Sequence, residues 1–197
     1  MWGQEPQLQQ VRERLKLLLA THTNELHPTT LHAKQGELLL KQDAPAKHLL
    51  LLTRGKVAIQ VQHQGQSPHT LTVVEAEAIV GEMGLFGSGT HSTDVRVVDG
   101  PAELLQVCGD ALLKALIYDS ELLIELLSLV SDRACNANKE ITLLLDCIHA
   151  AYKEDDILLD KGLIALTRLN SYISQTAQQL KMLGKKNERL TKSVRDK

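Results

Sequence analysis

Aromatic residues are scarce in this sequence: they make up 3 % of its 197 residues, with one Trp and one Phe. The core must therefore be aliphatic, and few side chains are available to stack on nucleic-acid bases. Cysteine is also rare, with only Cys108, Cys135 and Cys147, and no C-x-x-C pair occurs. This spacing argues against a zinc knuckle and a disulfide framework and fits a reducing compartment. We expect the three thiols to fill the core.

No apolar run reaches the roughly 18 residues that a membrane helix needs. The N-terminus, Met1–Gln10, lacks the basic region and apolar run of a signal peptide. The net charge of -2 excludes a globally basic nucleic-acid coat. Because 43 % of the residues are hydrophobic and 23 % charged, the chain can fill a core. These features predict a globular cytoplasmic protein.

Basic residues gather at the C-terminus, where residues 181–197 hold seven Lys and Arg against two Asp and Glu. Cations near the C-terminus of a helix are favoured by the helix dipole, which is the interpretation we prefer. The alternative is a tail that seeks an anionic or acidic partner.

The first half of the chain changes from a helical pattern to a strand pattern. Residues 6–20 carry apolar side chains at the 3–4 spacing of an amphipathic helix. Val57, Ile59 and Val61 then alternate with more polar residues, as in a half-buried strand. Six short strands are predicted: Leu38–Leu40, His48–Leu52, Lys56–Gln62, Thr70–Val74, Val95–Val98 and Ala102–Val107.

From Asp110 onward the pattern is helical, with a short helix at Asp110–Ile117 and a long one that begins at Ser120. The long helix has apolar residues at alternating intervals of four and three, which is a heptad seam. Its members are Leu123, Leu127, Val130, Ala134, Ala137, Ile141, Leu144 and Ile148. A second apolar side, Leu122, Leu126 and Leu129, suits packing on the chain's own domain. We predict a homodimer through the seam; pairing within one chain is the alternative.

A second heptad stripe follows in residues 153–197, which we predict to be a helical coiled-coil extension. Gly162 and Gly184 should each weaken this helix by roughly 1 kcal/mol relative to Ala. The stripe must pack on the same chain, on a dimer mate or on a client protein, and we expect its distal half to meet another chain. The candidate partner-binding residues are Leu166, Leu169, Ile173, Leu180, Leu183 and Leu190.

The stretch from Val80 to Thr93 contains the residues best suited to bind a ligand. Gly81 allows the backbone to approach a ligand, and successive N–H groups at a turn form an anion site. Glu82 can accept from ligand hydroxyls, and two hydroxyl side chains can donate to phosphate oxygens. The candidate ligand-binding residues are Gly81, Glu82, Met83, His91, Ser92 and Thr93.

The order of these elements resembles the cyclic-nucleotide-binding domain of the Crp–Fnr (catabolite activator) family over roughly residues 6–150. Gly81–Phe86 looks like that family's phosphate-binding cassette. The resemblance implies an α+β fold, with a jelly-roll-like antiparallel β-roll of about eight strands over residues 6–118. It also implies a dimerisation helix at 119–152. In that family the glutamate takes the ribose hydroxyl and an arginine pairs with the cyclic phosphate.

Three departures from the family pattern concern the ligand. Asp43 and Glu77 stand where the family usually has glycine. The phosphate-pairing arginine is absent, and His91 or Ser92 falls at its place. Histidine gives only a partial charge, whereas arginine gives a permanent charge and a bidentate fork. Three readings follow: retained cyclic-nucleotide binding, a different small ligand, or a ligand-free protein-interaction role, which we favour.

The winged helix-turn-helix of Crp–Fnr regulators has no counterpart in the pattern after Asp110. No nucleophile motif, phosphate-binding loop or metal-binding histidine pair stands out either, so we predict a non-enzymatic protein without a resident cofactor or metal. Our leading hypothesis is a regulatory or adaptor protein with a degenerate nucleotide pocket, acting as a homodimer with a protein partner. The alternatives are a sensor of a cyclic nucleotide such as cyclic AMP and a DNA-binding regulator.

Overall fold

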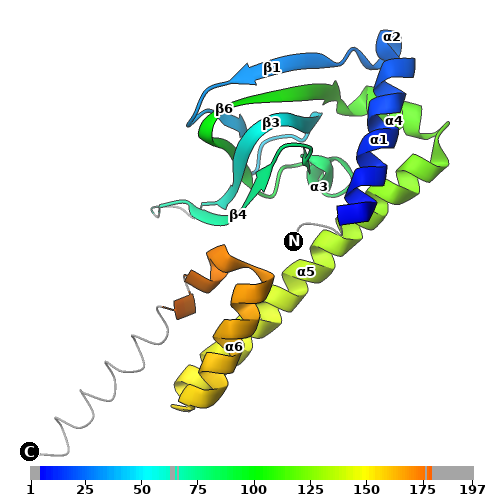
Figure 1. The fold of residues 1–197 in the computed structure, drawn as a ribbon. Helices are drawn as coiled ribbons and strands as arrows, with labels where there is room; N and C mark the ends of the chain where they lie inside the picture. The colour runs from blue at the N-terminus through cyan, green and yellow to red at the C-terminus, as the bar shows by residue number, and fades with distance from the viewer. Residues whose placement is uncertain (1–4, 63–64, 66, 176, 179–197) are drawn as a thin grey trace, which may run out of the picture. The chain divides into compact units, whose positions relative to one another are not determined.

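An antiparallel sheet of six strands forms the centre of the first of two units (Figure 1). The computed structural model describes residues 5–62, 65, 67–175 and 177–178, and the chain divides into the two units after Arg133. We call residues up to Arg133 the roll unit and residues from Ala134 onward the hairpin unit. The expected α+β fold class is confirmed.

Helices flank the strands of the roll unit along the sequence. The elements are α1 (Glu5–Thr21), α2 (Thr23–Leu26), β1 (Thr29–Ala33), β2 (Leu38–Leu40), β3 (His48–Val61), β4 (His69–Glu75), β5 (Ile79–Val80), α3 (Glu82–Leu85), β6 (Asp94–Cys108), α4 (Gly109–Leu116) and α5 (Ser120–Tyr152), the last of which continues into the hairpin unit. The strand order is β1-β6-β3-β4, while β2 pairs with β6 and β5 pairs with β3.

Two long strands account for the difference between the six strands described and the eight or so expected. His48–Leu52 and Lys56–Gln62 were predicted as separate strands, but both fall on the course of β3, and Val95–Val98 and Ala102–Val107 both lie in β6. Between them the β3–β6 register shifts twice, around Arg54. Gly55, which looks like a turn in the sequence, instead lets the paired strands bend, because a Cβ there would lie 2.6 Å from the Pro101 carbonyl oxygen.

The roll unit has an apolar cluster on each side of β3. Leu49 and Leu51 pack toward the helices, whereas Leu50 and Leu52 pack into the roll, as alternation along a strand requires. The helix-side cluster includes Leu122, Leu126 and Leu129 of α5, all of which are fully buried. The prediction that this side of the long helix packs on the chain's own domain is therefore confirmed.

The hairpin unit contains the rest of α5, a reverse turn and α6 (Asp156–Leu169). Asp155 caps α6 by accepting from the Leu158 N–H at 2.9 Å. The Asn170 side chain donates to Glu140 at 3.0 Å, and a Cβ on Gly162 would meet Cys147, so α6 runs antiparallel to α5. The cluster between the helices contains Cys147, Ala150, Leu159, Leu163, Leu166 and Ala177.

The predicted coiled-coil stripe is divided by this arrangement. α6 ends at Leu169, where Asn170 becomes extended and accepts from the Tyr172 N–H at 3.1 Å, starting a new helical segment. Leu166 is 0 % exposed among its own chain's residues, so its assignment as a partner contact is wrong. Leu169 is half-buried, and Ile173 packs against the same cluster. Leu180, Leu183 and Leu190 lie outside the described residues.

Gly162 stands where α6 comes closest to α5. A Cβ at this position would lie 2.7 Å from the Sγ atom of Cys147, a side chain that is itself fully buried. The glycine that seems to weaken the helix is therefore the residue that permits the contact.

Replacing Gly162 with Ala should destabilise the hairpin unit although alanine is the better helix former. Overpacking costs about 1–3 kcal/mol, which offsets the roughly 1 kcal/mol of helix propensity gained. Urea denaturation followed by circular dichroism measures the change. The double variant Gly162→Ala/Cys147→Ala removes the clashing sulfur and should be more stable than Gly162→Ala alone; if it is not, the contact does not limit packing.

The cysteines divide between interior and surface. Cys147 is buried, as predicted, but Cys108 and Cys135 are exposed, so the expectation that all three fill the core is wrong. Cys108 ends β6, and Cys135 follows Arg133 by two positions on α5, beyond the stretch of that helix that the roll covers. Within the described part of the chain, no helix combines the length and apolarity that a membrane span would need.

Candidate functional site

The Gly81–Phe86 cassette is a sharp turn from β5 into the short helix α3. Gly81 has a φ of 95°, and a Cβ there would lie 2.8 Å from the carbonyl oxygen of His48. The loop that follows α3 is held to the segment before β3 by backbone hydrogen bonds. The His91 N–H donates to Ala44 at 2.9 Å, and the Asp43 N–H donates to the His91 carbonyl at 2.8 Å. The cassette is therefore fixed on both sides.

Two of the departures from the family pattern, Asp43 and Glu77, hold a backbone conformation that favours glycine. Asp43 has a φ of 64° and Glu77 a φ of 74°, so both adopt the left-handed region that glycine accepts without strain. Holding a residue with a Cβ there costs on the order of 1–2 kcal/mol. The chain thus holds a side chain with a Cβ at both positions at some cost in stability.

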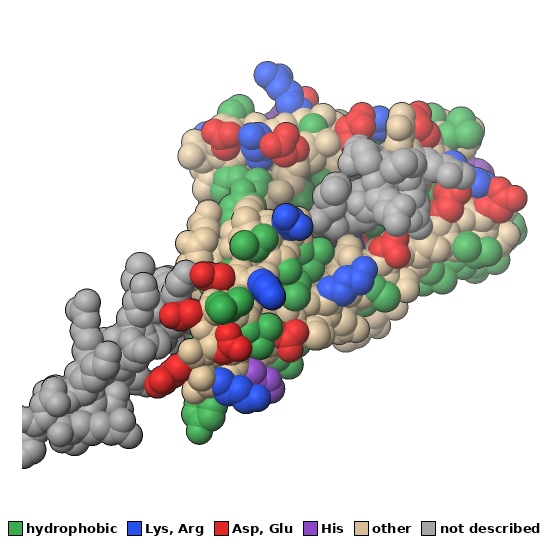
Figure 2. Space-filling view, turned by 60° about the horizontal axis from the view of Figure 1, so that its bottom comes forward, with side chains coloured by type: hydrophobic (Ala, Val, Ile, Leu, Met, Phe, Trp, Pro, Cys, Tyr) green, Lys and Arg blue, Asp and Glu red, His purple; other side chains and the backbone are tan. Residues whose placement is uncertain are grey.

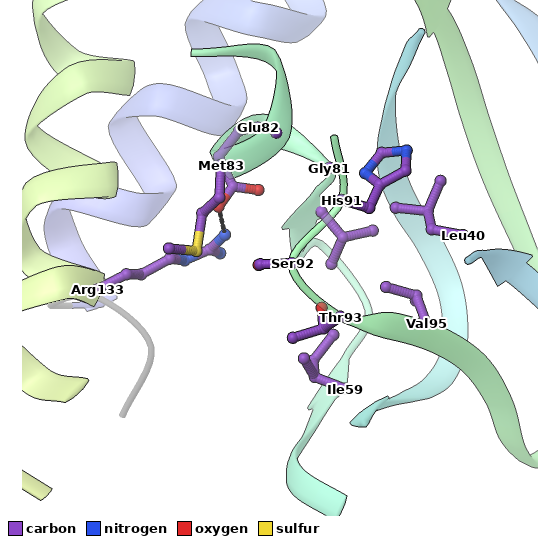
Figure 3. Close-up of a pocket in the computed structure, with 12 residues that line it drawn as sticks. Leu40, Ile59, Gly81, Glu82, Met83, His91, Ser92, Thr93, Val95 and Arg133 are labelled. Atoms are coloured by element: carbon purple, nitrogen blue, oxygen red, sulfur yellow. Dashed lines mark hydrogen bonds and ion pairs between the residues drawn. The ribbon is translucent and has the colours of Figure 1, made fainter. Parts of the chain in front are cut away.

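A small, half-open cavity lies between the cassette, the loop and α5 (Figure 3). All six predicted ligand-binding residues line it: Gly81, Glu82, Met83, His91, Ser92 and Thr93. Leu40, Ile59 and Val95 contribute an apolar wall. The cavity measures about 30 Å³, which is room for a few water molecules at most. Sites that enclose drug-sized ligands measure about 300–1,000 Å³, so a nucleotide would have to lie largely outside this cavity as it stands.

The cavity contains a buried ion pair that could not be predicted from the sequence pattern alone. Arg133 of α5 donates from Nη1 to the Glu82 carboxylate (Figure 3). Its Nη2 donates to the Ile79 carbonyl oxygen at 2.9 Å. The Arg133 and Glu82 side chains are 4 % and 2 % exposed. Arg133 continues the buried stripe of Leu126 and Leu129 at helical spacing. A charged residue on a buried helical stripe is the signal that could have identified it.

His91 does not replace the missing arginine as a charge. Its side chain is buried, and this burial lowers the pKa of the imidazole, with a further lowering from His48 and an opposing effect of the Glu82 charge. Because the ordinary pKa of histidine is about 6.5, the ring is neutral at pH 7. In Figure 3 the ring lies on the Leu40 side of the cavity, away from Arg133. Ser92 is exposed and Thr93 half-buried.

The permanent charges among the residues that line the cavity therefore cancel. Arg133 is the one permanent cation in this lining, and Glu82 is its partner. An anionic ligand would have to share or displace that guanidinium. Elsewhere in the described part of the chain, no cluster of three or more His, Cys, Asp and Glu side chains could hold a metal ion.

The predicted dimer seam lies largely at the surface of the single chain. Leu123, Val130 and Leu144 are half-buried, and the other members are exposed, namely Leu127, Ala134, Ala137, Ile141 and Ile148. Except for Leu144, which packs against the hairpin cluster, the seam residues from Ala134 onward take no part in it.

Comparison with known proteins agrees with this arrangement. Residues 30–119 match the family model of the cyclic nucleotide-binding domain. No curated protein sequence matches the chain. The cassette and the loop with His91 both lie inside the matched range, whereas Arg133 lies beyond it.

Solved structures show the same fold. The catabolite activator protein of Thermus thermophilus aligns with a TM-score of 0.58 and 20 % identity, over 89 % of this chain and 84 % of that one. A cyclic nucleotide-binding domain from Methylobacillus flagellatus aligns with a TM-score of 0.51 and 26 % identity, over 58 % and 66 %. The c-di-GMP responsive global regulator CLP of Xanthomonas campestris aligns with a TM-score of 0.53 and 21 % identity, over 65 % of each chain.

Proposed function

We propose that this chain, in which residues 30–119 are a cyclic nucleotide-binding domain, is a non-enzymatic regulatory or adaptor protein with a degenerate nucleotide pocket. It acts through helix-mediated dimerisation and contact with a protein partner. The observation that carries the proposal is the cavity of about 30 Å³, whose one permanent cation is already paired with Glu82.

The charge and the volume of the pocket both disfavour a bound cyclic nucleotide. In the family that the chain resembles, a glutamate takes the ribose hydroxyl and an arginine takes the phosphate. Here Glu82 accepts from Arg133, and the neutral His91 stands where the phosphate partner is expected. Truncating one partner of a buried charge pair costs about 2–5 kcal/mol, which is 30-fold to several thousandfold in affinity. The exposed seam on α5 supports dimerisation, since an apolar stripe of this length favours a partner.

A cyclic-nucleotide sensor is the second candidate. It is supported by the convergence of all six predicted ligand-binding residues on one cavity and by the family match. For a nucleotide to bind, the loop would have to open and Arg133 would have to turn from Glu82 toward the phosphate. The DNA-binding alternative draws no support from the described residues after Cys108, whose regular structure is entirely helical.

Calorimetry distinguishes the two candidates. We expect no binding heat with cyclic AMP, cyclic GMP or cyclic dinucleotides at up to about 1 mM, because the phosphate finds no free cation. Binding of cyclic AMP at low micromolar concentration would contradict the degenerate pocket.

Two variants test why the chain should not bind cyclic AMP. His91→Arg places a permanent charge at the cavity, whereas Ser88→Arg places the same charge on the same loop but outside the lining. If the missing cation alone prevents binding, only His91→Arg should bind cyclic AMP. If neither variant binds, the small volume of the cavity is the barrier.

A further inference from the structure

The hairpin unit has a second apolar surface in addition to its core. On α5, Ile141, Leu145, Ile148 and Tyr152 follow one another at intervals of four, three and four. On α6, Ile157 and Ile164 are seven residues apart. These six side chains are between 47 % and 88 % exposed, and none belongs to the cluster between the helices. Figure 2 shows hydrophobic side chains at the surface of this unit among acidic and basic ones.

The two stripes lie on the same face of the hairpin. Cys147 marks the side of α5 that faces α6, and Ile148 is one residue, or 100°, further around the helix. Leu163 marks the side of α6 that faces α5, and Ile164 is likewise one residue further around. Viewed from one end of the hairpin, the two antiparallel helices rotate in opposite senses. One residue beyond the contact position therefore points to the same side of the hairpin on both helices, which brings Ile148 and Ile164 to a common face. We call the six residues of the two stripes the outer face.

We propose that the outer face packs against the outer face of a second copy of this chain, so that two hairpins form a four-helix bundle. The proposal rests on the dimerisation proposed above and adds α6 to the interface. On α5 the face continues the seam, because Ile141 and Ile148 follow Leu127, Ala134 and Ala137 at heptad spacing. A mate that covers the seam therefore meets the outer face as well.

The shape and charge of the face fit an identical hairpin. The face is two helices wide, so a single client helix would leave part of it in water, whereas a second hairpin presents a surface of equal width. A two-fold axis requires a self-complementary surface, and both stripes are aliphatic except for Tyr152 at one end. The α6 stripe is flanked by charges of both signs, such as Asp160 and Lys161, which do not select a strongly charged partner.

Sedimentation equilibrium of the full-length chain tests the role of α6. Ile164→Glu places a carboxylate in each copy at the proposed interface, and we expect the dimer dissociation constant to rise at least about tenfold. Leu158→Glu is the matched control. It makes the same change at another exposed leucine-sized position of α6, which lies 100° from Ile157 and 120° from Ile164 in the same sense around the helix, and should leave the constant unchanged. Circular dichroism establishes that both variants keep their helices.

Three other results would contradict the four-helix bundle. If Ile164→Glu dimerises like the original chain while a charge in the α5 seam produces monomers, dimerisation through α5 stands and the four-helix bundle is wrong. If Ile164→Glu and Leu158→Glu weaken the dimer equally, the effect does not come from the outer face and the inference is overturned. If the unaltered chain is a monomer at about 100 μM, a Kd near or below the micromolar range is excluded, and both the bundle and the dimer fail.

Discussion

Replacing Arg133 with Met should lower the free energy of unfolding of the roll unit by about 3–5 kcal/mol, because Glu82 would remain buried without its partner. The loss exceeds that of an ordinary surface ion pair, which contributes about 0–1 kcal/mol. The Arg133 side chain also satisfies the Ile79 carbonyl oxygen, which would lose its donor. Urea denaturation monitored by circular dichroism gives the free energy of unfolding.

The double variant Glu82→Gln/Arg133→Met separates the ion pair from simple loss of packing. With both charges removed, no buried carboxylate is left uncompensated, so the double variant should be more stable than Arg133→Met. An Arg133→Met protein that unfolds at the same urea concentration as the original would show that Glu82 is hydrated or otherwise compensated. The pair would then not hold the cassette to α5.

Ala134→Glu should convert the dimer into a monomer. Ala134 lies in the middle of the seam and is exposed in the single chain. In a two-fold dimer two new carboxylates would meet across the axis, each desolvated and repelling the other. Light scattering should then give the mass of one chain, 21.8 kDa, in place of twice that mass.

Cys135→Glu provides the control for this variant. Cys135 is the next residue, is also exposed, and lies 100° further around α5, away from the seam. The same charge there should leave the dimer intact. If Ala134→Glu remains a dimer, the seam does not face another chain, and helix-mediated dimerisation would have to be abandoned.

Periodicity predicted local structure well where one face of an element is buried in its own domain. Leu122, Leu126 and Leu129 pack on the roll as their spacing indicated. The placement of the candidate site was also predictable in part, since Gly81, Glu82 and His91 line one cavity, whereas their role in binding stays a prediction. These features depend on neighbours in sequence or on a contiguous motif.

Contacts between distant segments could not be predicted in the same way. Arg133 and Glu82 are 51 residues apart, and only the packing of α5 against the cassette brings them together. The sequence around Gly55 predicts a turn, but glycine is needed there because the Pro101 backbone passes close to it. A heptad stripe indicates that a face is buried without indicating by what, so Leu166 was assigned to a partner although α6 folds back onto its own chain.

Because Cys147 is buried where Gly162 approaches it, the reactivity of its thiol reports the separation of α6 from α5. Burial shields Cys147 and raises the pKa of its thiol, whereas Cys108 and Cys135 are exposed. A thiolate-specific reagent should therefore modify the exposed pair in the folded protein and reach Cys147 only when α6 separates from α5. When the hairpin closes faster than the reagent reacts, the labelling rate of Cys147 is the intrinsic rate multiplied by the opening equilibrium constant. Peptide-resolved alkylation thus measures the local stability of the hairpin without denaturant, with Cys108 and Cys135 as internal standards.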